Sequence, residues 1–479
     1  MNVSKLYSVY AESHKLEIVT VEVAVRKGLP RFQIVGLAST YVKESAERIR
    51  SAIESTGREF PLGSILVNLS PSDSKKSHAS LDLAIAIGIL CAESANLEFP
   101  FPLENTVILG ELGLDGTVKS NKQIETFLQF ADVQKFKSLV PVLSPKASNR
   151  RNTKNAYRIQ NLKDIFEKKY IQNSEHLSTE NQNKKTKTIR LFENQVPIFK
   201  SLAIAISGNH HVLMIGSPGV GKSFLMKTME EILPKISEQH FRERVEFNLA
   251  NTEQIPIRTP HHSSSLISIL GGGLHVQPGE VTLAHGGILF FDELSFYKPE
   301  ILHGLREPLE TKKISISRNL EKIDLPSEFL FIGASNPCSC GNFGNILQEC
   351  TCLPPMVKQY LGKFTGPTLD RFHIGFYFQP SSSNKQVEID LEEYRNKIQR
   401  TRIQKLESKE TLRWTWKSRN LYDLYTEHSR DSSRSILQVK SLTETVAIFK
   451  GRDYVTVSDL NEALGMRQYL NFLKKQFPK

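Results

Sequence analysis

Cysteine and long apolar runs are both scarce in this chain. Five cysteines among 479 residues are too few for a disulfide framework, and residues 1–15 lack the apolar core of a signal peptide. The longest apolar run, around residues 81–91, contains Asp82 and is too short to cross a bilayer. These absences exclude disulfide-rich secreted proteins and helical membrane proteins, so we expect a reduced, cytoplasmic protein with no membrane partner.

Acidic residues are outnumbered by basic ones. The chain has 62 lysines and arginines against 51 aspartates and glutamates, a formal net charge of +11. Clustered basic side chains attract phosphates, which favours a nucleic-acid partner. An equally ordinary interpretation is a basic surface that binds no polyanion, because net charge describes general affinity and locates no site.

Hydropathy patterns divide the chain into four parts. Residues 1–168 mix strand-like segments (16–25, 65–69 and 107–112) with a helical one (42–56), which predicts an α+β domain. Residues 169–188 are polar and form an expected linker, where a basic run at Lys184 and Lys185 could alternatively touch phosphate. Residues 381–479 have a helical pattern with no convincing set of strands.

Residues 189–380 alternate apolar strands with glycine loops and helical stretches. The expected strands are 211–215, 245–249, 288–291, 329–333 and 374–378, and a helix is expected over 224–233. Near-continuous apolar strands between helices are typical of a buried parallel sheet. The predicted fold is therefore α/β, a parallel sheet with helices on both faces, followed by a helical lid.

The strongest motif is a phosphate-binding loop between an apolar strand and a helix. It fits the pattern G-x-x-x-x-G-K-[ST], and its residues are Gly216, Ser217, Pro218, Gly219, Val220, Gly221, Lys222 and Ser223. Backbone N–H groups and a helix N-terminus would cradle the phosphates of ATP. Lys222 is expected to contact the β and γ phosphates, and Ser223 to bind Mg²⁺.

Two later strand ends complete this expected site. Asp292 and Glu293 follow the apolar segment 288–291, and we expect Asp292 to hold Mg²⁺ and Glu293 to polarise the attacking water. Asn336 ends the segment 329–336 and would lie beside the γ-phosphate, or else serve only as a turn or capping residue.

Four of the five cysteines lie close together in the sequence. Cys338, Cys340, Cys350 and Cys352 form two C-x-C pairs separated by nine residues. Four thiolates can hold a structural Zn²⁺ tetrahedrally, although C-x-C is tighter than the usual spacing. Free thiols are the alternative, and Cys91, in an apolar segment, is expected to be a core residue.

These elements, in this order, resemble the ComM/YifB family within the magnesium-chelatase-like branch of AAA+ ATPases. The resemblance covers nearly the whole chain. The phrases that carry it are residues 28–30, 34–37, 42–45 and 67–71 near the N-terminus, then 256–263, 271–273, 278–280, 283–285, 292–294, 305–310, 335–338 and 366–371.

Further roles follow from the resemblance. It implies that Arg371 is an arginine finger that reaches a neighbouring subunit's γ-phosphate, and that Arg434 is a lid arginine that senses phosphate in its own subunit. Either could instead be a surface or salt-bridged arginine. It also implies a homo-oligomer, a hexameric ring, because a site that lies between subunits requires neighbours.

The resemblance implies a DNA motor that drives branch migration of recombination intermediates during natural transformation. The expected pore element is a hairpin over residues 310–318 with Lys312, Lys313 and Arg318 at its ends, suited to phosphate contact. A solvated edge hairpin is the alternative. The adjacent His261 and His262 are expected to be structural or DNA-facing.

Two other functions stay open. A magnesium-chelatase motor subunit has a similar ATPase core, but the N-terminal domain and the cysteine insert argue against it. The N-terminal domain resembles the Lon-protease type, whose Ser–Lys dyad would make an ATP-dependent protease. Glu125 stands where we place the protease lysine, although Ser77, Ser80, Lys119 and Lys122 offer a shifted dyad.

Overall fold

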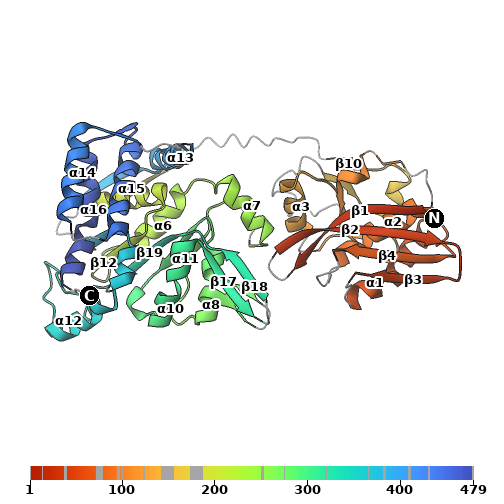
Figure 1. Ribbon diagram of the computed structural model, residues 1–479, viewed down its shortest axis with the longest axis horizontal. Helices are drawn as coiled ribbons and strands as arrows, with labels where there is room; N and C mark the ends of the chain where they lie inside the picture. Colours follow the sequence, from red (N-terminus) through yellow and green to blue (C-terminus); the bar gives the residue numbers. More distant parts are fainter. Residues whose placement is uncertain are drawn as a thin grey trace. The chain divides into compact units, whose positions relative to one another are not determined.

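The structure is a computed structural model of the chain (Figure 1). It describes residues 2–12, 15–36, 40–71, 79–93, 98–99, 101–121, 124–141, 156–172, 187–249, 253–273, 276–318, 321–364, 366–380, 385–407, 412–429 and 432–476. Two compact units are present, residues 1–181 with 241–251 and residues 182–240 with 252–479.

The first unit contains an eight-stranded mixed sheet in the order β10-β9-β8-β5-β1-β2-β4-β3. Its strands are β1 (Asn2–Glu12), β2 (Lys15–Arg26), β3 (Arg31–Val35), β4 (Ser64–Ser70), β5 (Thr106–Ile108), β8 (Lys137–Pro141), β9 (Ala156–Ile159) and β10 (Ile171–Gln172). Its helices are α1 (Thr40–Ser55), α2 (Asp82–Glu93) and α3 (Ile124–Val133). The predicted segments 16–25, 42–56 and 65–69 are confirmed as β2, α1 and β4.

The core of this unit forms where α2 packs against β1 and β2. Val19, Val21 and Val23 on β2 are fully buried, because alternate residues of a strand face the same side of the sheet. Helix α2 is apolar all round and almost wholly buried, as expected for a helix that is covered on every side. Cys91 on α2 packs against this core, as predicted.

One expected strand of the first unit is divided. The segment 107–112 forms β5, a break at Leu109 and Gly110, and β6 (Glu111–Leu112), which pairs with β7 (Val118–Lys119). The N–H of Gly110 donates to the carbonyl of Ser80 at 3.0 Å. That bond to another segment takes Gly110 out of the strand ladder.

The second unit is organised around a five-stranded parallel sheet in the order β13-β16-β19-β12-β20. The strands are β13 (Ile257–Arg258), β16 (Ile288–Phe291), β19 (Leu330–Ser335), β12 (Val212–Gly216) and β20 (Ile374–Phe378). Four of them match predicted segments. Since all five run the same way, their carboxyl ends meet at one edge of the sheet, and the motif residues follow those ends.

Helices and short strands surround this sheet. They are β11 (Thr188–Phe192), α5 (Val196–Gly208), α6 (Lys222–Ile232), α8 (Leu266–Leu270), β14 (Gly271–Gly272), β15 (Gln277–Pro278), α9 (Glu280–Leu283), α10 (Pro299–Gly304), α11 (Arg306–Thr311), β17 (Lys313–Arg318), β18 (Glu321–Pro326) and α12 (Pro354–Leu361).

The predicted strand at residues 245–249 is wrong. The segment continues α7 (Glu238–Glu246) and ends in a helix-terminating turn. Asn248 has a φ of +52°, and the N–H of Leu249 donates to the carbonyl of Arg244 at 2.9 Å. This is the bonding of a left-handed C-terminal cap, so the alternating apolar residues reflect the end of a helix.

The C-terminal part is helical, with one addition to the prediction. The helices of this part are α13 (Leu391–Glu407), α14 (Trp416–His428), α15 (Ser433–Phe449) and α16 (Val457–Gln476), and Figure 1 shows α14, α15 and α16 alongside one another. Strand β21 (Gln386–Asp390) precedes them and pairs antiparallel with β11, a partner too distant in sequence to predict. Two short strands between these helices, β22 (Arg413–Trp414) and β23 (Tyr454–Val455), pair with each other in parallel.

The helices were also compared with the requirements for crossing a membrane. Across the described residues, none combines the length and the apolar character that a bilayer span requires.

Candidate nucleotide site

The phosphate-binding loop lies between β12 and α6, as predicted. Gly219 and Gly221 have φ values of +79° and +98°, a region that glycine adopts without strain. Helix α6 begins directly after Gly221, so its free N–H groups face the loop. A cradle of backbone donors at a helix N-terminus fits the phosphates of a nucleotide.

Lys222 is held at the centre of this loop. Its ammonium donates to the carbonyls of Gly216 at 2.6 Å and Ser217 at 3.1 Å, and to Oδ1 of Asn336 at 3.3 Å. Burial lowers the pKa of Lys222 to about 8, against the opposing influence of Asp292 and Glu293. The predicted lysine and the predicted strand-end asparagine are therefore brought into direct contact.

Ser223 and Asp292 meet at the same edge of the sheet. The Ser223 hydroxyl donates to Oδ2 of Asp292 at 2.8 Å, because β12 and β16 both end there. A hydroxyl and a carboxylate are oxygen ligands of the kind that Mg²⁺ prefers. The two residues predicted to hold Mg²⁺ thus form one donor set.

Glu293 occupies a tight turn after β16. Its φ is +52°, and its side chain is about half exposed (55%), with Nδ1 of His262 3.6 Å from its Oε2. His262 in turn packs against His261, with ring centroids 4.1 Å apart. No local sequence pattern indicates that His262 faces Glu293, because the two lie in separate loops that only the fold brings together.

Sequence reasoning missed a residue that supports the phosphate loop. Gln195 ends a short helical turn at Glu193–Gln195 and is 7% exposed. Its amide donates to the carbonyl of Val220 at 3.1 Å. A single glutamine before a helix has no distinctive sequence signal, so only the fold identifies this contact.

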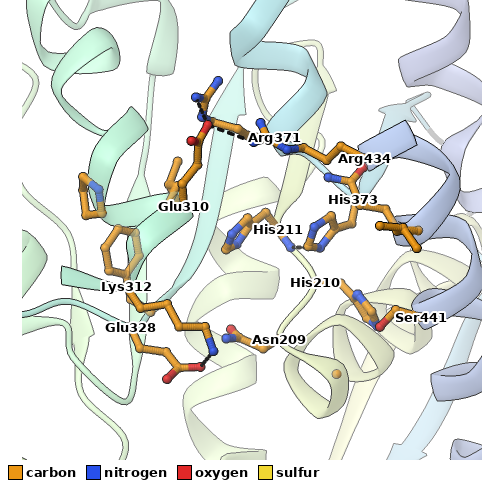
Figure 2. A pocket seen from close by; sticks show the side chains of 16 residues that line it. Asn209, His210, His211, Glu310, Lys312, Glu328, Arg371, His373, Arg434 and Ser441 are labelled. Carbon is orange, nitrogen blue, oxygen red and sulfur yellow. Dashed lines mark hydrogen bonds and ion pairs between the residues drawn. The ribbon is translucent and has the colours of Figure 1, made fainter. Parts of the chain in front are cut away.

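Arg371 and Arg434 share one carboxylate at a second location (Figure 2). Both form ion pairs with Oε1 of Glu310, and for Arg434 the separation is 3.0 Å. The three residues line a cavity of about 740 Å³. The side chain of Arg371 is 11% exposed and that of Arg434 46%.

This cavity lies at the edge of the sheet opposite the phosphate loop. His211 lines it and immediately precedes β12, whereas the loop follows Gly216 at the far end. Five residues of strand span about 17 Å. The N–H of His373 bonds to the carbonyl of His211 at 2.8 Å, which fixes Arg371 at the same edge. Arg434 stands beside Arg371 in this cavity, so its predicted role in its own subunit stays a prediction.

Three histidines form the floor of the cavity and contribute little charge. His210 is buried, and His211 and His373 are partly buried. Desolvation lowers the pKa of His211 to about 4 and those of the other two well below the usual value. The rings of His211 and His373 stack at 4.9 Å. Positive charge in the cavity therefore comes from its arginines and from Lys312 (Figure 2).

The predicted hairpin exists, but its bounds differ. Residues 310 and 311 complete α11, Lys312 caps that helix with a φ of +59°, and the strands are β17 and β18. Lys312 pairs with Glu328 at 2.5 Å. Lys313 is exposed at the start of β17, and the side chain of Arg318 lies outside the described residues. Lys312 therefore faces an acidic partner and the cavity, and is not at a hairpin tip.

The four clustered cysteines converge in space. Their sulfurs lie within 4.8 Å of one another, with Cys338–Cys350 at 3.7 Å, Cys340–Cys350 at 3.6 Å and Cys338–Cys340 at 3.3 Å. A tetrahedron with Zn–S bonds of about 2.3 Å has S···S edges of about 3.8 Å. The backbone N–H of Phe343 donates to Sγ of Cys338 at 3.2 Å. The donor set fits a zinc ion.

The possible protease dyad receives no geometric support where it can be assessed. The Ser80 hydroxyl is buried without a hydrogen-bond partner among the described residues, whereas Lys119 is exposed on β7. Ser77 and Lys122, like Lys184 and Lys185 of the linker, lie outside the described residues, as does the side chain of Glu125.

Comparison with known proteins agrees with this geometry. The family described as "Magnesium chelatase, subunit ChlI" matches residues 192–386, and "Subunit ChlI of Mg-chelatase" matches residues 21–144. "Competence protein ComM" of Haemophilus influenzae is 29% identical over 99% of both chains. "Uncharacterized protein YifB" is 33% identical in Salmonella typhimurium and in Escherichia coli, over 74% of this chain and 72% of each relative. The chain therefore belongs to the ComM/YifB family of magnesium-chelatase-like AAA+ ATPases.

Proposed function

We propose that this protein is an ATP-driven motor that remodels DNA, and that it drives branch migration of recombination intermediates. The observation that carries the proposal is the division of the catalytic groups. Lys222, Asp292 and Asn336 gather at one edge of the sheet, and the arginine pair lies at the other. A subunit built this way completes its neighbour's site, which is the arrangement of a ring motor.

Each nucleotide-site residue has a role that follows from its chemistry. Lys222 neutralises negative charge on the β and γ phosphates. Ser223 and Asp292 would hold Mg²⁺, which would supply further positive charge there. Glu293 accepts the proton of the attacking water. Asn336, already in contact with Lys222, orients the γ-phosphate.

Arg371 and Arg434 both act on the next subunit in this proposal. An arginine neutralises the charge that develops on the transferred phosphoryl group. Because Glu310 joins the two arginines, one cavity presents both to the neighbour. A head-to-tail contact of this kind closes into a ring, and we take the ring to be a hexamer.

DNA as the substrate rests on the relatives and on charge. The relative that spans 99% of both chains is named a competence protein, and this chain carries a net charge of +11. Lys313 and Arg318, on the hairpin β17–β18, are the proposed phosphate contacts, and Lys312 has a weaker claim because it is paired with Glu328. Converting Lys313 to Ala should weaken DNA binding and leave basal ATP hydrolysis unchanged. Equal DNA affinity would remove the hairpin from the proposal.

The deciding experiment measures ATP hydrolysis with and without four-way-junction DNA. Glu293→Gln protein is the blank. Stimulation by the junction, absent from the blank, supports a DNA motor and leads to a branch-migration assay. If no DNA substrate changes the rate of ATP hydrolysis, the result would favour metal insertion or protein remodelling as the function.

A magnesium-chelatase-like motor subunit is the second candidate, because the matching family bears that description. It requires a porphyrin-binding partner, so ATP-dependent Mg²⁺ insertion into a porphyrin with chelatase partner subunits tests it. An ATP-dependent protease is a weaker candidate, since Ser80 and Lys119 differ in exposure. Casein cleavage that depends on ATP would restore it.

The remaining assignments are part of the same proposal. Residues 1–168 form a Lon-protease-like domain, 169–188 a linker, 189–380 the AAA+ domain with the cysteine insert at 338–352, and 381–479 the lid. The four cysteines hold one structural Zn²⁺, for which the sulfur separations are the support. The protein works in the cytoplasm, where its DNA intermediates would be.

A further inference from the structure

The cysteine cluster adjoins the phosphate loop. Its first ligand, Cys338, stands two residues after Asn336, the residue that contacts Lys222. Strand β19 ends at Ser335, just before both residues. Nucleotide-contacting and thiolate residues therefore share one short stretch of chain.

Asn345, between the two C-x-C pairs, reaches the phosphate loop directly. Its side-chain amide donates to the hydroxyl of Ser217 at 3.2 Å, and Ser217 is only 4% exposed. The carbonyl of the same serine accepts a bond from Lys222 at 3.1 Å. Asn345 is thus one residue removed from the catalytic lysine.

Backbone packing adds a second contact. Gly341 has a φ of +82°, and a Cβ there would lie 2.5 Å from Cδ of Pro218. The absence of a side chain lets the cysteine loop sit directly on the phosphate loop. Position 341 therefore requires glycine both for its φ and for this close approach.

The far side of the cysteine loop is fixed to β20. The hydroxyl of Tyr377 donates to the carbonyl of Phe343, and the amide of Gln379 donates to the carbonyl of Gly344 at 3.0 Å. The loop therefore bridges the phosphate loop and the neighbouring strand end. Large apolar side chains in and beside the loop add little to a core, since Ile346, Leu347 and Leu353 are exposed.

We infer that the metal held by Cys338, Cys340, Cys350 and Cys352 is a clamp that pre-forms the ATP site, so that metal loading sets nucleotide affinity. The inference rests on the proposed zinc and ATP sites. Four ligands from one short segment fix a loop that lacks a core of its own. The fixed loop then presents Asn345 to Ser217 and holds Gly341 against Pro218. Without the metal, ATP must order both loops when it binds, which lowers affinity.

The test compares zinc content with nucleotide affinity in the full-length protein. Cys350→Ser removes a ligand, and Asn345→Ala breaks the contact to Ser217 while it keeps every thiol. Cys91→Ala is the matched cysteine control, and Ile346→Ala, whose side chain is 66% exposed, is the control within the loop. Zinc is measured by elemental mass spectrometry, and affinity by titration with a fluorescent ATP analogue.

We expect one zinc per chain in the wild-type protein and in both controls, with equal affinity. Asn345→Ala also removes bonds to Asn342 and to the N–H of Leu347 within the loop. It should keep the zinc and raise Kd about fivefold, the effect of losing the bond to Ser217. Cys350→Ser should lose the zinc and raise Kd more than the Asn345 variant does. If Cys350→Ser is insoluble, the wild-type protein stripped with a zinc chelator replaces it, and added zinc should restore affinity.

Unchanged affinity in Asn345→Ala and in metal-free protein would overturn the clamp, even with zinc present. A wild-type protein that contains no zinc would overturn both the metal site and the clamp. Failure of the DNA-motor proposal would give a different result. DNA would not change the rate of ATP hydrolysis, whereas the variants would still change the affinity for ATP.

Discussion

Mixing two inactive variants should restore ATP hydrolysis if the arginines act between subunits. Lys222→Ala removes the lysine from a subunit's own phosphate site, and Arg371→Ala removes the arginine offered to the neighbour. The amino edge where Arg371 lies is about 17 Å along the sheet from the phosphate loop, farther than its side chain reaches. Each variant alone should therefore lose activity, Arg371→Ala by about 10³-fold or more in kcat.

The expected recovery follows from counting interfaces. In randomly mixed rings with equal amounts of both variants, half of the phosphate sites are intact and half of the neighbouring arginines are intact. About one quarter of the interfaces then combine the two, as a head-to-tail arrangement requires. Steady-state hydrolysis of the mixture should reach about a quarter of the wild-type rate per subunit if interfaces act independently.

The control is the double variant, Lys222→Ala with Arg371→Ala, mixed with either single variant. No complete interface can form in the mixture with Arg371→Ala, since neither subunit carries the arginine. Co-assembly is verified by affinity-tag capture of the untagged variant. A mixture that assembles but hydrolyses no ATP would refute a site shared in this way and would place the function of Arg371 within its own chain.

Three further predictions concern the nucleotide site. Glu293→Gln should bind ATP normally yet lower kcat by about 10²-fold or more, and a rate near wild type would remove Glu293 as the base. Because burial lowers the pKa of Lys222 to about 8 and bound phosphate favours the charged ammonium, ATP binding takes up a proton above that pH. The Kd for ATP should therefore rise as pH increases through 8, by up to about tenfold per unit, and a flat calorimetric titration series would contradict this. Gln195→Ala should raise Kd about fivefold at unchanged saturating kcat, and an unaltered Kd would show that its bond to Val220 contributes nothing.

The sequence predicted the parts of the fold that depend on local pattern. Segments 288–291 and 374–378 are strands with those very bounds, because an apolar run between glycine loops determines a buried parallel strand locally. The phosphate loop and Asp292 were predicted for the same reason, since a motif after a strand fixes its own position. The failure at 245–249 has the opposite cause, because a helix end with alternating apolar residues imitates a short strand.

Contacts between segments that are distant in the sequence could not be predicted from local sequence patterns. Nothing near Glu310 in the sequence indicates that its carboxylate joins Arg371 and Arg434, so the sequence could not show that the two arginines lie side by side. Phosphate contact at Ser217 needs only its backbone, so the motif alone assigns no role to its hydroxyl. Its hydroxyl instead receives Asn345, a pairing of residues 128 positions apart that depends on the completed fold.

The pairing of β11 with β21 has a mechanical consequence for the chain that precedes residue 188. Thr188 lies opposite Asp390, and the N–H of Leu391, the first residue of α13, donates to the carbonyl of Lys187 at 3.1 Å. Residue 187 and the start of α13 therefore leave the pair at the same end and are displaced together. A load that pulls Lys187 away from Leu391 would therefore open the ladder one pair at a time, beginning with Thr188 and Asp390.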